Sequence, residues 1–188
     1  VDSMPTISLT DCHVKGGTIN STSGARVGGL IGWTAGYNDP NDGPVDTYIS
    51  IRNCSVELCN ITAKGSVGGP IGHAGGNPAT YHDIADCKLV NNYLYSTDDG
   101  GWRVGALVGT ANVGQVTVDA ATSATGNTLS QTDKTSAALA DGLFGRAVVN
   151  NDGLVIVDNT VVATAEKYGV AVGDKVTSDN LVKDENGV

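Results

Sequence analysis

Short runs in which apolar and polar residues alternate recur along the chain, separated by polar or glycine-rich corners. Residues 7–14 read ISLTDCHV, residues 49–56 ISIRNCSV and residues 84–89 IADCKL. A period of two is what a half-buried β-strand shows, because successive side chains point to opposite faces of a sheet. Long runs with the 3.6-residue spacing of helices are absent. The pattern therefore predicts an all-β protein.

A glycine-rich hexapeptide follows these alternating runs and returns along the chain. It reads VGGLIG at residues 27–32, VGGPIG at 67–72 and VGALVG at 104–109, with weaker copies at 140–145 (ADGLFG) and 168–173 (YGVAVG). Successive copies end 28 to 40 residues apart. A period of this size is typical of repeat architectures, in which a unit too small to form its own core buries its apolar face against neighbouring units.

About three short β-tracts with glycine-rich corners are expected in each unit. The tracts fit a triangular solenoid coil better than a four-stranded propeller blade, and TDCHV, RNCSV and ADCKL fall at the same place in successive units. We therefore predict a right-handed parallel β-helix (β-solenoid) of about five irregular coils. Residues 1–173 are expected to form one solenoid domain, and residues 174–188 a polar C-terminal cap or tail.

The three strong hexapeptides resemble the GLUG motif, a Gly-Leu-hydrophobic-Gly repeat of large bacterial surface proteins, including adhesin-like proteins and regions beside IgA-cleaving metallopeptidases. Pro70 replaces the leucine in the second copy, Ala106 replaces a glycine in the third, and Ala171 replaces the leucine in the fifth. The resemblance implies a β-solenoid stalk or adhesive segment on a bacterial surface. It transfers no catalytic residue.

Composition narrows the classes of partner. The formal net charge is −9 and the sequence pI is about 4.5, and no basic stripe is present, so nucleic acid is not an expected partner. No apolar run approaches the roughly 20 residues that cross a bilayer, so no membrane span is expected in this chain. Low charge and many Asn, Thr, Ser and Gly residues favour an extracellular or cell-surface location. The chain is expected to be a fragment of a larger protein, and its oligomeric state is left open.

Four cysteines allow disulfides, a metal site or a nucleophile. Cys12, Cys54 and Cys87 occupy equivalent places in their units, which favours a column of small buried side chains continued by Ala120 in the fourth unit. Parallel, in-register cysteines rarely reach disulfide geometry. Cys59 has the opposite parity from Cys54 and is expected to face away from that column. No CxxC spacing that would indicate zinc occurs.

An acidic stretch follows the first hexapeptide. Asp39, Asn41, Asp42 and Asp46 bring oxygen ligands together beside Gly43, and calcium prefers such ligands. The spacing does not match an EF-hand, so a solvated turn is the competing interpretation. Calcium at Asp39, Asn41 and Asp42 is thus the one cofactor that the sequence suggests.

Exposed aromatic side chains are the candidate binding residues. Trp33, Tyr37, Tyr81, Tyr95 and Trp102 are all expected in or beside loops, over residues 33–46, 73–83 and beyond. Rings with a polar handle suit sugar or protein recognition, and anchoring of the loops against the coil is the competing interpretation. The strongest binding candidates are Trp33, Tyr37, Tyr81 and Trp102.

The histidines indicate little catalytic chemistry. His73 takes the place that Trp33 and Thr110 hold in neighbouring units, so it is expected on the surface. No Gly-x-Ser-x-Gly elbow that would indicate a serine hydrolase is present.

The leading hypothesis is a non-enzymatic extracellular repeat module with a structural or adhesive role on a bacterial cell surface, which binds a host protein or glycan through its loops. The alternative is a polysaccharide lyase or glycosidase built on a parallel β-helix, for which Asp39, Asp42, Asp83 and Arg103 are the loose candidates. Binding of ice or mineral would need regular threonine ladders, and the threonine spacing is irregular.

Overall fold

The computed structural model describes most of the chain and contains no α-helix in the described part. It describes residues 6–23, 26–76, 79–97, 103–132, 134–135, 143–157 and 160–164. These residues form strands joined by turns and short irregular segments, and they include no helix that could cross a membrane. The predicted polar segment 174–188 and the fifth hexapeptide lie outside the described residues.

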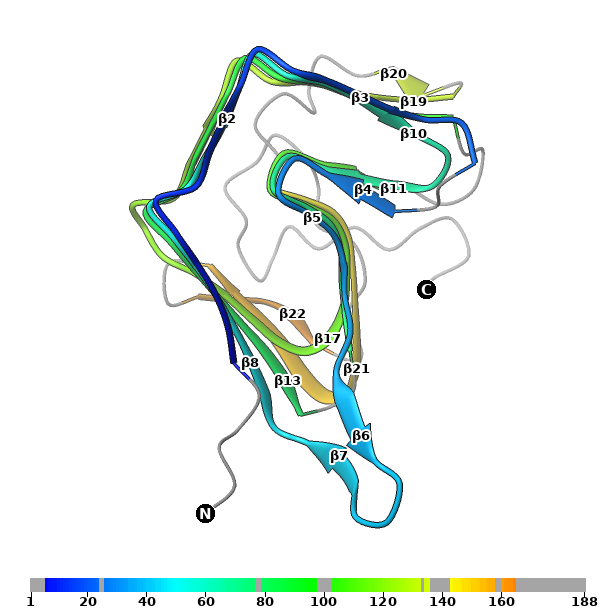
Figure 1. Cartoon of the computed structure of the whole chain (residues 1–188), viewed down its shortest axis with the longest axis vertical. Coiled ribbons are helices and arrows are strands. Elements are labelled where there is room, and N and C mark those ends of the chain that lie inside the picture. Colours follow the sequence, from blue (N-terminus) through cyan, green and yellow to red (C-terminus); the bar gives the residue numbers. More distant parts are fainter. Residues whose placement is uncertain are drawn as a thin grey trace.

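Five strands, and not three, make up one coil. In the second coil they are β8 (Thr47–Arg52), β9 (Ser55–Glu57), β10 (Asn60–Ala63), β11 (Ser66–Gly68) and β12 (Ile71–Gly75). The first three strands form the outer part of the coil, and the last two fold back inside it (Figure 1). The prediction of three tracts in a triangular coil is wrong for two reasons: the first alternating run divides into two strands at its corner, and the hexapeptide contributes two strands, one on each side of a sharp turn.

The other coils repeat this order. The first contains β1 (Thr6–Thr10), β2 (His13–Lys15), β3 (Thr18–Ser21), β4 (Arg26–Gly28) and β5 (Ile31–Thr34), followed by the hairpin β6 (Tyr37–Asp39) and β7 (Gly43–Val45). The third contains β13 (Thr80–Ala85), β14 (Lys88–Val90), β15 (Tyr93–Ser96), β16 (Val104–Gly105) and the start of β17 (Val108–Val118). The rest of β17, then β18 (Ser123–Thr125), β19 (Thr128–Gln131), β20 (Lys134–Thr135), β21 (Phe144–Val157) and β22 (Thr160–Thr164) complete the described strands.

Successive coils stack through parallel strands in register. Five strands, one from each successive layer, form a parallel sheet in the order β1-β8-β13-β17-β21, which we call the five-layered wall. The inner strands stack as β4-β11-β16 and β5-β12-β17. The hexapeptides pair residue by residue, with Val27 beside Val67 and Val67 beside Val104. In Figure 1 the chain turns clockwise as it recedes from the N-terminal coil, which makes the helix right-handed. The predicted right-handed parallel β-helix is confirmed, and β22 pairs antiparallel with β21 at its C-terminal side.

Inward-facing side chains form continuous apolar columns. Ile51, Ile84 and Val118 stand in one column, and none is more than 1% exposed. Leu94 stacks between Ile61 and Leu129 in the same way, with no exposed surface on any of the three side chains. Burial of one such side chain stabilises the fold by about 1.5–3 kcal/mol.

Two corners of each coil have the same local conformation, in which a residue with positive φ precedes a residue whose side chain points inward. In the first corner φ is 56° at Asp11, 49° at Asn53 and 50° at Asp86. In the second corner it is 53° at Leu58 and 52° at Asn91. Asp and Asn tolerate this left-handed conformation better than most residues. The chain thus turns while the next side chain is directed inward.

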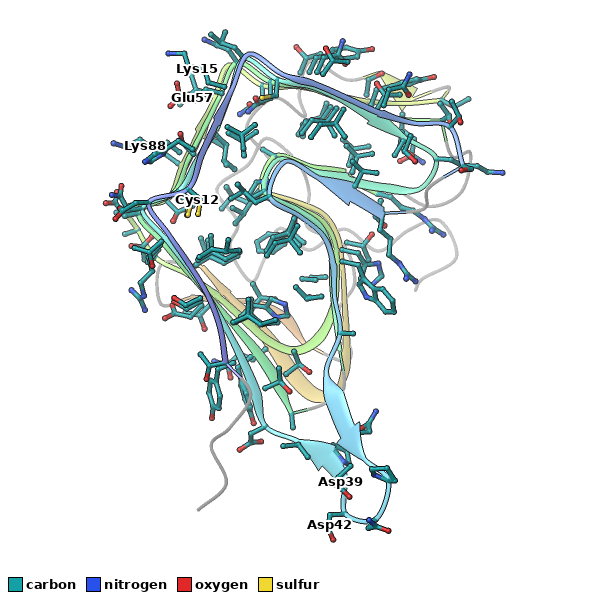
Figure 2. All side chains as sticks on the ribbon, in the orientation of Figure 1. Cys12, Lys15, Asp39, Asp42, Glu57 and Lys88 are labelled. Atoms are coloured by element: carbon teal, nitrogen blue, oxygen red, sulfur yellow. The ribbon has the colours of Figure 1, made fainter. Side chains whose placement is uncertain are left out.

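The predicted cysteine column lies at the first corner. Cys54 and Cys87 are 2% and 1% exposed, and Cys12 points into the coil (Figure 2). The thiol of Cys54 donates to the carbonyl of Leu9 at 3.6 Å, and that of Cys87 donates to the carbonyl of Ile51 at 3.7 Å. Burial raises the pKa of Cys87 to about 11, so its thiol keeps the proton that it donates.

Two predictions about this column are wrong. Cys59 does not face away, because it is 2% exposed, and its thiol donates to the carbonyl of Val14 at 3.8 Å. Counting parity from Cys54 fails because the positive φ at Leu58 reverses the alternation. The fourth member of the column is Thr122 and not Ala120, since the corner after β17 holds one extra residue before Ser123 pairs with Lys88.

Glycines in the hexapeptide permit close contact between backbones. A Cβ atom at Gly72 would lie 2.4 Å from the backbone nitrogen of Val27, and one at Gly109 would lie 2.6 Å from that of Val67. A distance this short requires the backbone to shift. Each β5-type strand therefore approaches the β4-type strand of the preceding coil as only glycine allows.

Candidate functional site on the outer wall

Outward-facing side chains of β8, β13 and β17 form two parallel columns on the five-layered wall. Parallel register places Tyr48, Tyr81 and Gln115 in one column. The next outward column contains Ser50, Asp83 and Thr117. We call these six residues the tyrosine face.

The two tyrosines stack on each other. Their ring centroids are 5.0 Å apart, and the ring planes differ by 17°. The side chain of Tyr48 is 38% exposed. Desolvation raises the pKa of the Tyr81 hydroxyl, and the negative charge of Asp46 raises it further. The Tyr81 hydroxyl therefore stays protonated at neutral pH and can donate a hydrogen bond.

Polar groups beside the rings are held in place by their neighbours. Arg52 forms an ion pair with Asp83, and its Nε donates to Ser50 Oγ at 3.2 Å. Gln115 Nε2 donates to Thr117 Oγ1 at 3.2 Å. These contacts orient a carboxylate, two hydroxyls and an amide next to an aromatic surface.

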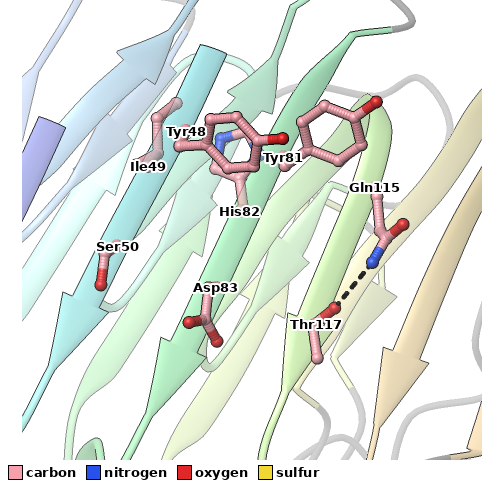
Figure 3. Close-up of a pocket in the computed structure, with 8 residues that line it drawn as sticks. All are labelled: Tyr48, Ile49, Ser50, Tyr81, His82, Asp83, Gln115 and Thr117. Carbon is pink, nitrogen blue, oxygen red and sulfur yellow. Dashed lines mark hydrogen bonds between the residues drawn. The ribbon is translucent and has the colours of Figure 1, made fainter. Parts of the chain in front are cut away.

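A shallow depression of about 370 Å³ lies at this face. Figure 3 shows the tyrosine rings along one side and the hydrogen-bonded Gln115 and Thr117 along the other. Tyr48, Ile49, Ser50, Tyr81, His82, Asp83, Gln115 and Thr117 line the depression. The depression is large enough for one or two rings of a ligand. Because it is open to solvent, it suits a ligand that lies along the wall and not one that the protein encloses.

His82 anchors the wall from inside. Its imidazole is 1% exposed, and its Nε2 lies 2.7 Å from the hydroxyl of Thr34 on the opposite strand β5. That hydroxyl also donates to the carbonyl of Gly75 at 3.2 Å and accepts the Gly75 N–H at 3.1 Å. Burial lowers the pKa of His82 to about 4, so the ring is neutral at pH 7. The interior contact fixes the strand that carries Tyr81 and Asp83.

The predicted aromatic residues do not gather at one place. Tyr81 lies in strand β13 and Trp33 in strand β5, so the expected loop positions of both are wrong. Trp33 is 54% exposed, with the Arg26 guanidinium 4.3 Å from its ring centroid. Trp102 and the side chain of Tyr37 lie outside what the structure describes. Of the four binding candidates, Tyr81 alone is placed on the tyrosine face.

The acidic stretch forms the tip of the β6–β7 hairpin, where Asp39 and Asp42 project away from the coils (Figure 2). Asp39 Oδ1 accepts the backbone N–H of Asn41 at 2.8 Å and that of Asp42 at 3.1 Å. This is the side-chain-to-backbone bonding of a turn, so the carboxylate of Asp39 already has partners. The calcium site at Asp39, Asn41 and Asp42 stays a prediction.

Tyr48 escaped the sequence prediction although a signal was present. Tyr48 and Tyr81 each precede their corner cysteine by six residues, in TYISIRNC and TYHDIADC. Equal spacing from Cys54 and Cys87 places the two rings at the same position of adjacent, paired strands. Both tyrosines lie in strands and not in the loops where the sequence predicts binding residues.

The fold and this face define a right-handed parallel β-helix with an aromatic and polar outer wall. Comparison of the chain with models of known protein families, with curated proteins and with solved structures finds no match. The resemblance to the GLUG motif therefore stays a prediction that rests on the hexapeptides.

Proposed function

We propose that this chain is a non-enzymatic, extracellular repeat module of a bacterial cell surface and that it binds a glycan at the tyrosine face. The observation that carries the proposal is the stacked pair Tyr48 and Tyr81 beside oriented polar groups over a shallow depression. Sugar rings present both C–H faces, which pack on aromatic rings, and hydroxyls, which need fixed hydrogen-bonding partners.

The architecture supports an adhesive or structural role. Neighbouring coils contribute one residue each to every outward column, so a ligand lying along the wall contacts several coils at once. Rigid strands hold Ser50, Asp83 and Thr117 through cross-strand register and not through a closing loop. A preformed site of this kind costs little ordering entropy on binding.

Binding to the tyrosine face is tested with an array of bacterial and host glycans, followed by calorimetric titration of the glycans that bind. We expect Tyr81→Ala to weaken binding about tenfold or more, as truncation of a central aromatic contact does. Tyr93→Ala is the matched control, because Tyr93 is a similarly exposed tyrosine, 42% exposed, on the separate sheet that contains β15. Equal loss in the two variants, or no glycan bound by the native chain, contradicts the proposal.

Surface display is tested separately by protease treatment of intact cells. We expect the protein to be cleaved from intact cells under conditions that leave cytoplasmic marker proteins whole. Complete protection, with cleavage after lysis, would count against the extracellular location while leaving the glycan measurements standing.

One observation favours the enzymatic alternative, a polysaccharide lyase or glycosidase. Asp83 lines the depression and is paired with Arg52, and a carboxylate base beside a cation is what elimination at a sugar acid uses. The other candidates lie elsewhere, with Asp39 and Asp42 on the hairpin and Arg103 before β16. Turnover of acidic polysaccharides by the native chain, abolished in Asp83→Asn, would establish this alternative in place of simple binding.

A further inference from the structure

A second surface of different chemistry lies on the inner strands that the hexapeptides form. Strand register places Arg26 beside Ser66 at the start of β4 and β11, and it places Arg103 at the equivalent position of the third coil, just before β16. On the neighbouring strands β5 and β12, Trp33 pairs with His73. We call Arg26, Arg103, Trp33 and His73 the arginine face; Ser66 and Thr110, which stand in the same two columns, are buried.

Side-chain contacts join the column of Arg26, Ser66 and Arg103 to the column of Trp33, His73 and Thr110. Arg26 stacks on the Trp33 ring with its guanidinium carbon 4.3 Å from the ring centroid. Ser66 Oγ and Thr110 Oγ1 are hydrogen-bonded at 2.8 Å. The two arginines are two coils apart, which corresponds to about 10 Å along the axis. Because Ser66 and Thr110 are only 2% and 7% exposed, their bond joins the two columns below the surface that Arg26 and Trp33 expose.

The arginine face is positive on an acidic protein. The net charge of the chain is −9, yet residues 26–34, 66–76 and 103–111, which supply this face, contain no Asp or Glu. Arg26 is exposed, and the contact of its guanidinium in the described part of the chain is with the Trp33 ring rather than with a carboxylate. A guanidinium that is stacked in this way is oriented but still offers its N–H groups to an anion.

His73 lies within reach of both charges. Burial lowers its pKa to about 4, and the positive charges of Arg26 and Arg103 lower it further in the same direction. At neutral pH the imidazole is therefore uncharged and can both donate and accept a hydrogen bond. The face combines two cations, a neutral imidazole and an indole ring that is 54% exposed.

We infer that the arginine face binds a carboxylate-bearing sugar, such as a uronic or sialic acid unit of an acidic glycan. The Arg26 guanidinium pairs with the sugar carboxylate in the two-pronged geometry that this group favours. Trp33 and His73 then contact the ring and its hydroxyls. An acidic peptide is the weaker fit, because it has little use for the indole and the imidazole. This inference does not depend on the tyrosine face.

The test is calorimetric titration of the whole chain with an oligogalacturonate, with sialyllactose, with an uncharged oligogalactoside and with a polyglutamate peptide, at low and at moderate salt. We expect an acidic sugar to bind and the uncharged oligogalactoside to bind about tenfold or more weakly, because the charged hydrogen bonds are lost. Binding should weaken as salt screens the charges. Failure of both acidic sugars, or equal binding of polyglutamate, overturns the inference.

Variants separate a site from general attraction between charges. Arg26→Gln and Lys15→Gln each remove one exposed positive charge, but Lys15 lies on β2, where it pairs with Glu57 at 3.7 Å (Figure 2). We expect a loss of about tenfold or more for Arg26→Gln and almost none for Lys15→Gln. Trp33→Phe keeps an aromatic ring and should retain part of the affinity. Equal losses in the two charge variants would overturn the inference.

Thermal unfolding of each variant shows whether loss of binding reflects loss of the fold. Tyr81→Ala distinguishes this inference from the proposed function. If it abolishes glycan binding at the tyrosine face but leaves the acidic sugar bound, the two sites are separate, as inferred here. If it abolishes both, the acidic sugar binds at the tyrosine face and the inference fails.

Discussion

Replacing His82 by valine should remove a large part of the acid sensitivity of the fold. His82 stands in an inward column between Ile49 and Val116, so valine suits the position. Thr34 loses the imidazole but keeps both hydrogen bonds to Gly75, so no buried hydroxyl is left unpaired. The substitution thus isolates the contribution of one titrating ring.

The magnitude follows from the pKa of the ring in the two states. In the folded protein the pKa of His82 is lowered from 6.5 to about 4, so the unfolded chain binds more protons between these two values. The stability that His82 contributes as a neutral ring is therefore complete above pH 6.5 and is lost progressively as the pH falls towards 4. Over the 1.5 units from pH 6.5 to pH 5, at about 1.36 kcal/mol per unit, the loss is about 2 kcal/mol.

The assay is reversible urea unfolding, followed by circular dichroism at pH 7, 6 and 5. We expect the free energy of unfolding of the native chain to fall by about 2 kcal/mol more than that of His82→Val over this range. His73→Gln tests the second lowered pKa: burial, with the charges of Arg26 and Arg103, lowers the pKa of His73 to about 4, so this variant should reduce the pH dependence in the same direction. Parallel pH dependence in the native chain and in His82→Val would refute the reasoning.

Two further substitutions test the corners and the close backbone contacts. Asn92→Ala should destabilise the fold by about 2–4 kcal/mol, because it leaves the buried carbonyl of Val56, which accepts from Asn92 Nδ2 at 2.7 Å, without that donor. Gly72→Ala should cost about 3 kcal/mol, since its Cβ would lie 2.4 Å from the backbone nitrogen of Val27. Gly17→Ala is the matched control, with no atom within 4 Å of the added Cβ. Urea denaturation measures all three, and equal midpoints for the two glycine variants would contradict the packing argument.

The stacking of coils could be predicted from the sequence because it depends on recurrence. Identical residues at equal places, such as Val27 and Val67, pair in register as expected. The internal path of the coil could not be predicted. The hexapeptide is too rich in glycine to show alternation, so its two strands resemble a single strand with a corner. The alternating run before it reads as one strand because nothing in its apolar pattern marks the corner at Asn53, where β8 and β9 separate, and these two features explain why the sequence predicts three tracts and not five.

The candidate site was harder to predict for a related reason. Residues 73–83 contain glycine, proline and asparagine, which predicts a loop, yet β13 begins at Thr80 and includes Tyr81. Pairing with Tyr48 in the preceding coil extends the strand beyond what its local composition favours. Register between distant segments decided the outcome, and local composition carries little information about register.

Corner side chains explain why the outer faces can differ from coil to coil. At the second corner the carbonyls of Val14, Val56 and Leu89 are satisfied in turn by the thiol of Cys59 and by the amides of Asn92 and Asn127. Cysteine and asparagine thus have the same role, a buried donor that joins one coil to the preceding one. Because these donors and the apolar columns fix the register from inside, stability constrains the outward positions less than the inward ones. The exposed residues of the two faces proposed here as binding surfaces occupy such positions, which are free to acquire tyrosine in one column and arginine in another.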